Sequence, residues 1–223
     1  MRLLGIETSD NTSSIALFCD GRLHAEDVFY SHLVLCDQLT PRITKLLESD
    51  WNLDGIAVSC GPGSFTGLRI GVSTAKALGH ALGVPVVGVP TQHVLAAGCG
   101  PLADRVAVIQ KARRGHVYAG LYRVEPDGVG ELQPVQLLAF EQVYDYVNGA
   151  RIAVGDGLTE AAQTDHRLNG LNTVGAPYDV PRAAVVLRLA DWPPKYSFAQ
   201  LAALRPQYLL ASQAERIHGI EID

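Results

Sequence analysis

The chain has 223 residues, of which 48% are hydrophobic and 18% are charged, and its formal net charge is −5. This balance predicts a folded globular protein with one large domain or two lobes, and it excludes a disordered chain. A protein that binds RNA or DNA unaided generally carries a basic field, so the acidic balance argues against tight, direct binding to nucleic acid.

The sequence shows no pattern that is typical of a targeting signal. The opening MRLLGIETSD becomes polar too early for a signal peptide, and no apolar stretch reaches the length of a membrane span. Four cysteines occur without a C-x-x-C pair, which is typical of reduced, buried thiols. We therefore expect a cytoplasmic protein with no membrane partner.

The first part of the chain predicts five strands and three helices. Alternating or continuous apolar runs indicate strands at residues 3–8, 14–20, 23–30, 55–60 and 85–90. Apolar positions at helical spacing indicate helices at residues 33–49, 66–82 and 91–98. Pro41 lies inside the first helix and lacks an amide donor, so a kink or a short first segment is expected there.

The same order then begins again. Strands are expected at residues 105–112, 116–124, 131–139 and 151–157, and helices at 140–149 and from 158 onward. A further helix at 182–192, a linker and a last helix from 197, running into an extended end, complete the chain. The repeated order of three strands, helix, strand, helix predicts two α/β lobes with mixed sheets, at residues 1–103 and 104–223.

A glycine-rich segment, SCGPGSFTGLRIG at residues 59–71, follows the fourth strand. It is not a Walker A loop, because no Gly-Lys-Ser/Thr closes it. It does not fit a dinucleotide fingerprint, because no acidic residue for the ribose lies between Asp54 and Asp104. It fits a serine nucleophile elbow poorly. Two interpretations remain: a ligand-binding loop, or a tight turn that caps the next helix through Ser64 or Thr66.

Small residues recur every four positions along the helix that follows this loop. They are Gly67, Gly71, Ala75, Gly79 and Gly83. Glycine within a helix costs about 1 kcal/mol relative to alanine, so the stripe predicts that another backbone approaches closely. The approaching backbone belongs either to this chain or to another subunit, and the pattern leaves both open.

Hydroxyl side chains crowd the turn after the first strand, in GIETSDNTSS. Such a turn suits a phosphate, and the carboxylate of Glu7 is placed to hold a water or a metal. The alternative is an ordinary polar hairpin. The candidate nucleotide or phosphate residues are Glu7, Thr8, Ser9, Gly63 and Ser64.

No metal or catalytic constellation stands out. The histidines include no pair at i, i+4, and no nucleophile, base and oxyanion donor occur at recognisable spacing. Lys111, Arg113, Arg114 and His116 share one predicted hairpin, which favours a solvated turn over a phosphate site. We predict no metal ligand and no catalytic residue.

Several segments together resemble the bacterial TsaB family, also called YeaZ, of tRNA threonylcarbamoyladenosine biosynthesis. They are LLGIETS, SHLVLCDQLTPRI, GPGSFTGLRIGVSTAKALGHALGVPVVGV, ARRGHVYAGLYR and PQYLL. The resemblance is strong over residues 2–89, fair to about 123 and weak beyond. Lys111 stands where the family usually has an acidic residue, and His116 where glutamate is common.

The resemblance implies an actin-like (ASKHA) fold with a ribonuclease H-like repeat and an accessory, non-catalytic role. Members pair with a paralogue, TsaD, that carries a metal-binding histidine pair and transfers threonylcarbamoyl to adenosine 37 of tRNAs that read codons starting with A. A TsaE-type ATPase joins them, and an unpartnered member forms a homodimer. The group is related by descent to M22 glycoprotease-like proteins.

Carried over by position, the helices at 33–49 and 66–82 form the partner interface. Its predicted residues are His32, Leu35, Leu39, Gly67, Arg69, Ile70, Gly71, Thr74, Ala75, Leu78 and Gly79. No cofactor is expected on the chain alone, ATP or ADP with magnesium is placed at the subunit junction, and tRNA is contacted only indirectly. The alternative is a stand-alone, kinase-like ATPase that uses Glu7, Thr8 and Ser9, with a metal-dependent peptidase a distant third.

Overall fold

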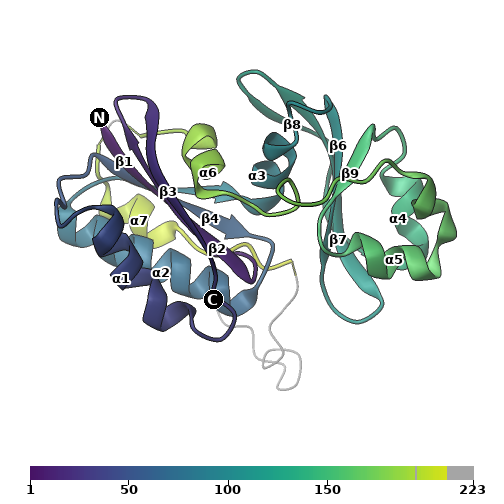
Figure 1. Cartoon of the computed structure of the whole chain (residues 1–223), viewed down its shortest axis with the longest axis horizontal. Coiled ribbons are helices and arrows are strands. Elements are labelled where there is room, and N and C mark those ends of the chain that lie inside the picture. Colours follow the sequence, from purple (N-terminus) through teal and green to yellow (C-terminus); the bar gives the residue numbers. More distant parts are fainter. Residues whose placement is uncertain (194, 210–223) are drawn as a thin grey trace.

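The computed structural model describes residues 1–193 and 195–209 of the chain and contains two mixed β-sheets (Figure 1). The first sheet has the order β3-β2-β1-β4-β5. In this sheet β1 pairs antiparallel with β2 and parallel with β4. The bounds of its strands are β1 Arg2–Glu7, β2 Thr12–Cys19, β3 Arg22–Tyr30, β4 Gly55–Gly61 and β5 Val86–Pro90.

Two helices, α1 (Leu35–Leu46) and α2 (Phe65–Leu82), cover one face of this sheet (Figure 1). Helix α1 continues across Pro41, so the expected short first segment is wrong. Leu39 and Ile43, on either side of Pro41, are both buried in the core, and their packing holds the helix together where the proline removes a hydrogen bond.

The second sheet repeats the pattern with the order β8-β7-β6-β9, in which β6 and β9 are parallel. Its helices are α4 (Phe140–Tyr146), α5 (Leu158–Thr164) and the 3₁₀ helix η1 (His166–Gly170). Its strands are β6 Arg105–Lys111, β7 His116–Glu125, β8 Gly128–Ala139 and β9 Ile152–Val154. The recurrence of β-β-β-α-β-α confirms the predicted two-lobed, actin-like α/β fold with mixed sheets.

Helix α3 (Thr91–Gly98) connects the lobes and belongs to both cores (Figure 1). Val94 packs with the first lobe, whereas Leu95 and Ala96 pack with the second. The hydroxyl of Tyr122 on β7 donates a buried hydrogen bond of 2.7 Å to Gln92 Oε1 of α3. The link between the lobes is therefore a packed interior and not an exposed linker.

The C-terminal part returns to the first lobe, which corrects the predicted assignment of residues 104–223 to one lobe. Helix α6 (Ala183–Leu189) covers the second face of the first sheet, where a side chain at Gly5 would overlap Ala183 and Leu187. Helix α7 (Phe198–Ala203) lies against α2. The first sheet has two apolar faces, and α6 buries the one that α1 and α2 leave open. The predicted extended end runs to Leu210, which lies outside the described residues.

Within residues 1–193 and 195–209, no helix combines the length and apolarity that crossing a membrane requires.

Candidate functional site

The glycine-rich loop wraps around the turn that follows β1. Ser64 N donates a hydrogen bond of 2.7 Å to Ser9 O, and a side chain at Gly63 would overlap Ser9. Ser64 is the N-cap of α2, with Oγ accepting a 3.2 Å hydrogen bond from Gly67 N. Of the two predicted caps, Ser64 is confirmed. The contacts described above therefore join the loop to residues of the same chain.

The stripe of small residues faces the protein's own sheet. A side chain at Gly67 would overlap Thr8 O, one at Gly71 would overlap Thr8 Oγ1, and one at Gly79 would overlap Val86. Each of these glycines is buried within the chain, as is Ala75. The close approach that the stripe predicts is therefore internal packing.

Six of the predicted interface residues are enclosed by the chain itself, which corrects that part of the prediction. They are Leu35, Leu39, Gly67, Gly71, Ala75 and Gly79. The prediction of these positions followed from the family resemblance. On α2 the small residues turn toward the sheet, where a side chain added at the glycines would overlap Thr8 or Val86. On α1, Leu35 and Leu39 pack into the core. The other predicted interface residues reach the surface. His32 and Arg69 are exposed, and Ile70, Thr74 and Leu78 are half-buried.

Sequence reasoning missed three exposed apolar residues beside them. Leu33 is 91% exposed, Val34 38% and Phe65 39%. Leu33 also has φ of 64°, a left-handed conformation that nothing in its sequence context indicates. We define the α1–α2 surface as His32, Leu33, Val34, Phe65, Arg69, Ile70, Thr74 and Leu78.

A pocket of about 340 Å³ opens in this surface, between the N-terminal ends of α1 and α2. His32, Leu33 and Ile70 line it together with polar groups from the turn after β1. His32 Nδ1 lies 3.0 Å from Asn11 Oδ1, which fixes the ring against that turn. The surface is therefore hollowed and mixed in polarity, as protein interfaces commonly are.

The candidate phosphate residues lie together but are mostly enclosed. Glu7, Thr8 and Ser9 are buried, and the Thr8 hydroxyl donates a 2.9 Å hydrogen bond to Gly67 O. Glu7 Oε1 accepts a 2.6 Å hydrogen bond from Ser9 N, while Glu7 Oε2 and Ser9 Oγ have no partner within the described residues. Burial raises the pKa of Glu7 to about 7, so the carboxyl group is close to half protonated at neutral pH.

Acidic groups from both lobes face the turn after β1. Burial raises the pKa of Asp10, and the carboxylates of Asp156 and Asp179 raise it further, whereas Lys111 lowers it. Lys111 N donates a 2.8 Å hydrogen bond to Asp156 Oδ1. An excess of negative charge between the lobes disfavours a bare polyphosphate there. In residues 1–193 and 195–209, no group of three or more His, Cys, Asp or Glu side chains is arranged as a metal site.

The basic hairpin stays at the surface. Arg113 and Arg114 are exposed, and Arg113 contacts His116 of the same turn at 3.3 Å. This arrangement agrees with a solvated turn.

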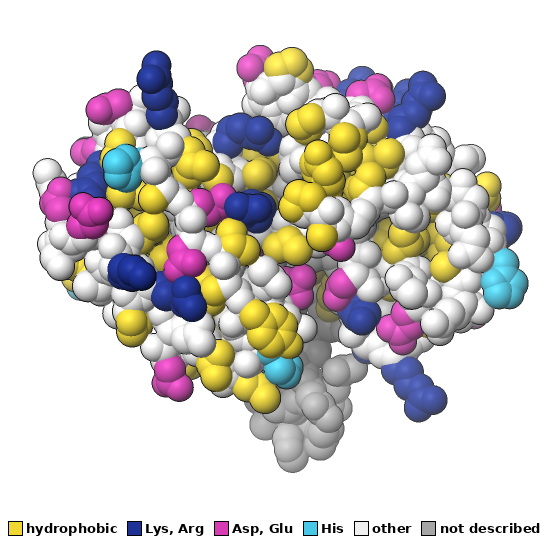
Figure 2. Space-filling model, in the orientation of Figure 1, with side chains coloured by type: hydrophobic (Ala, Val, Ile, Leu, Met, Phe, Trp, Pro, Cys, Tyr) yellow, Lys and Arg dark blue, Asp and Glu magenta, His cyan; other side chains and the backbone are white. Residues whose placement is uncertain are grey.

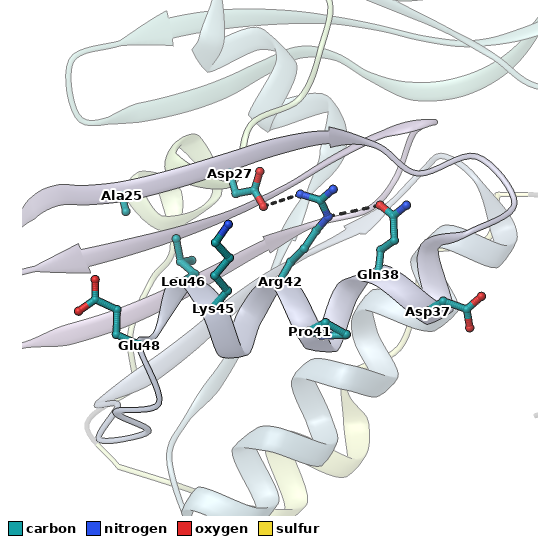
Figure 3. Close-up of a pocket in the computed structure, with 9 residues that line it drawn as sticks. All are labelled: Ala25, Asp27, Asp37, Gln38, Pro41, Arg42, Lys45, Leu46 and Glu48. Atoms are coloured by element: carbon teal, nitrogen blue, oxygen red, sulfur yellow. Dashed lines mark hydrogen bonds and ion pairs between the residues drawn. The ribbon is translucent and has the colours of Figure 1, made fainter.

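A larger hollow of about 690 Å³ lies between β3 and α1 (Figure 3). Arg42 points across it from α1. Its Nη1 donates a 2.7 Å hydrogen bond to Asp27 Oδ2, and its Nε donates one of 3.3 Å to Gln38 Oε1. The residues around it include none of the predicted site residues. Within this hollow the Arg42 guanidinium is already paired with Asp27.

The four cysteines are free thiols, but only two are buried. Burial raises the pKa of both Cys60 and Cys99 to about 11, which makes these thiols unreactive. Cys36 is exposed on α1 and Cys19 is half-buried, so the prediction of buried thiols is wrong for these two.

Comparisons with known proteins agree on the class of this protein. Residues 28–201 match the family model described as TsaD, tRNA N6-adenosine threonylcarbamoyltransferase. A solved structure described as YeaZ from Pseudomonas aeruginosa superposes with a TM-score of 0.71 at 27% identity, covering 84% of this chain and 89% of that chain. Fold and family model together define a two-lobed relative of the threonylcarbamoyltransferases.

Two curated relatives narrow the assignment. The tRNA threonylcarbamoyladenosine biosynthesis protein TsaB of Escherichia coli is 30% identical over 172 residues, covering 70% of this chain and 72% of the relative. The TsaB protein of Bacillus subtilis is 35% identical over 140 residues, which are 61% of this chain and 61% of that relative's length. The chain belongs to the TsaB (YeaZ) family, whose members are paralogues of TsaD.

Proposed function

We propose that this protein is an accessory subunit in the biosynthesis of threonylcarbamoyladenosine in tRNA, and that it acts in the cytoplasm. It binds and activates a TsaD-type catalytic paralogue, together with a TsaE-type ATPase. The complex transfers threonylcarbamoyl to adenosine 37 of tRNAs that read codons starting with A. Membership of the TsaB family supports this role, and the subunit itself is non-catalytic.

The observation that carries the proposal is the exposed, left-handed Leu33 of the α1–α2 surface. A non-glycine residue in the left-handed region costs roughly 1–2 kcal/mol. Here that cost falls on an apolar side chain that is 91% exposed, so burial of this side chain against the described residues offsets little of it. Strained conformations persist where a function uses them, and a partner that buries Leu33 supplies that use.

The same surface serves self-association when the partner is absent. A partner helix laid across Leu33, Val34 and Ile70 buries the same atoms as a second copy would, so the homodimer and the mixed complex exclude one another. Transfer RNA is held by the partner subunits. The net charge of −5 and the interspersed acidic and basic side chains in Figure 2 support this indirect role.

Nucleotide belongs at the subunit junction, with magnesium, and not on the isolated chain. The enclosed hydroxyl of Thr8 and the carboxylates around Asp10 support this placement, because a polyphosphate would meet few donors here.

The experiment is Leu33→Asp, with Leu23→Asp as the matched control. Leu23 lies on the edge strand β3 and is 50% exposed, so its replacement tests the effect of an added charge alone. Light scattering after size exclusion, on each variant mixed with the TsaD-type paralogue of the same host, should show a mixed complex for the unaltered chain and the control but not for Leu33→Asp. A complex that forms equally well with Leu33→Asp would refute the proposed surface.

A second candidate function rests on Glu7. Glu7 Oε2 has no hydrogen-bond partner in the part of the chain that the structure describes, and this favours a stand-alone, kinase-like ATPase. This alternative predicts Mg-ATP turnover by the isolated chain that Glu7→Gln abolishes. If the unaltered chain and the Glu7→Gln variant show the same Mg-ATP turnover, the ATPase alternative is wrong.

A further inference from the structure

A cluster at one end of the α1–α2 surface combines two aromatic rings with a guanidinium group. We propose that Phe65, Arg69 and Tyr208 form a preorganised socket for a carboxylate side chain of the partner protein, with Tyr208 as a positioning residue. The inference rests on the proposed function and names the chemistry that the partner must present.

The geometry of the cluster is compact. Arg69 Cζ lies 4.0 Å from the centroid of the Phe65 ring and 5.8 Å from that of Tyr208. The two ring centroids are 5.1 Å apart. Arg69 Nε donates a 3.0 Å hydrogen bond to the Tyr208 hydroxyl. The guanidinium group is thus held by two rings and by one of its own donors.

The other donors of this guanidinium group have no partner among the described residues. Within residues 1–193 and 195–209, no acceptor contacts Arg69 Nη1 or Nη2, and the side chain is exposed. With Nε engaged by Tyr208, the remaining pair Nη1 and Nη2 presents the end-on fork that a carboxylate binds through both oxygens. The Tyr208 hydroxyl accepts from Nε and keeps its own hydrogen for a further acceptor.

Tyr208 is fixed in place by the C-terminal segment. Gln207 N donates a 2.6 Å hydrogen bond to Cys60 O at the end of β4. Lys76 Nζ donates to the carbonyl oxygens of Ala202 and Leu204 at 3.1 and 3.0 Å. The segment is therefore anchored both to β4 and to α2. This explains how a residue 139 positions away from Arg69 can orient it.

Orientation before binding matters because a free arginine loses much side-chain freedom when it is immobilised in an interface. Here the rings and Tyr208 have already restricted it. Arginine and aromatic residues are also the types most enriched among energetically dominant interface residues. The socket is consequently suited to anchor one acidic side chain within an otherwise apolar contact.

A protein carboxylate fits better than a nucleic-acid phosphate. Arg69 adjoins Ile70 of the α1–α2 surface, and the exposed apolar side chains of Leu33, Val34 and Phe65 continue from it. The chain as a whole is acidic, with a net charge of −5, which disfavours a groove that tracks a phosphate backbone.

The test measures the affinity of the whole chain for the TsaD-type paralogue by isothermal titration. Arg69→Gln should weaken binding about 30-fold, and Arg69→Lys, which keeps the charge but loses the fork, about 10-fold. Arg22→Gln, on exposed β3, is the matched control and should leave the affinity unchanged. Tyr208→Phe should weaken binding a few-fold in the unaltered chain and have no further effect in Arg69→Gln, because it acts through Arg69.

Four outcomes contradict the socket. Unchanged affinity for Arg69→Gln, while Leu33→Asp still breaks the complex, refutes it and leaves the proposed function standing. An effect of Tyr208→Phe that persists in Arg69→Gln assigns Tyr208 a merely structural role. If Arg69→Gln spares the protein complex but lowers the retention of tRNA by the assembled complex in a mobility-shift assay, the anion is a phosphate and the carboxylate assignment is wrong. The absence of any complex with the unaltered chain overturns both proposals.

Discussion

Thr8 and Gly67, 59 residues apart, are joined by a 2.9 Å hydrogen bond from the Thr8 hydroxyl to the Gly67 carbonyl oxygen. This close contact also leaves no space for a side chain at Gly67, because an added Cβ would overlap Thr8 O. The end of β1 and the first turn of α2 are thereby locked together. The glycine-rich loop makes this close contact possible. The remaining faces of α2 lie against α1, the C-terminal segment and solvent.

Replacing Gly67 with alanine should lower the free energy of unfolding by about 2–3 kcal/mol, because the added Cβ would overlap a backbone oxygen. Gly98→Ala is the matched control: it also lies in a helix, but an added Cβ there meets nothing within 4 Å, so it should be neutral or stabilising. Urea unfolding of both variants checks this. Equal stability of the two variants would contradict the packing.

The pH dependence of stability should carry the signature of Glu7. Burial raises its pKa from 4.5 to about 7 in the folded protein. Below pH 4.5 the carboxyl group is protonated in both states. As the pH rises toward 7 the unfolded chain ionises first, so stability falls by about 3 kcal/mol, at about 1.4 kcal/mol for each pKa unit. Above pH 7 the loss is complete.

Glu7→Gln should remove this loss, so the difference in stability between the variant and the unaltered chain should move in favour of the variant from pH 4.5 to 7. Chemical unfolding at several pH values measures it. Glu48→Gln, at an exposed position, controls for the loss of one charge. A difference that is constant across this range would show that Glu7 titrates normally.

The lobes should unfold together. Tyr122→Phe leaves Gln92 Oε1 without the buried donor that lies 2.7 Å away and should cost about 1–2 kcal/mol. Both tryptophans, Trp51 and Trp192, pack in the first lobe, whereas circular dichroism reports on both lobes. Coincident fluorescence and dichroism transitions, both displaced by Tyr122→Phe, are the expected result. If Tyr122→Phe displaces only the transition seen by circular dichroism, α3 does not couple the unfolding of the two lobes.

Much of the fold follows from local patterns. Apolar alternation located the strands of both sheets, and Ser64 was among the predicted caps because its hydroxyl precedes the first apolar turn of α2. Their arrangement into two lobes followed from the repeated order. Such signals are short-range, so a single sequence contains them.

What escaped prediction depends on neighbours far apart in the chain. The glycine stripe indicated a close approach, but only the folded chain shows that Thr8 makes it. The return of α6 to the first sheet depends on which face α1 and α2 leave open. The left-handed backbone of Leu33 has no local signal, because leucine does not favour it. The sequence therefore indicated five residues of the proposed α1–α2 surface but not the exposed, left-handed Leu33 beside them.

The shared core around α3 also restricts motion. Hinge closure around a ligand requires a few residues that can rotate freely between two bodies. Here the connecting helix contributes Val94 to one core and Leu95 to the other, and rotation would break the Gln92–Tyr122 hydrogen bond. The two lobes are therefore expected to move as one body. The fold then sets the position of Asp10 in the first lobe relative to Asp156 in the second, and Asp156 acts electrostatically on Asp10.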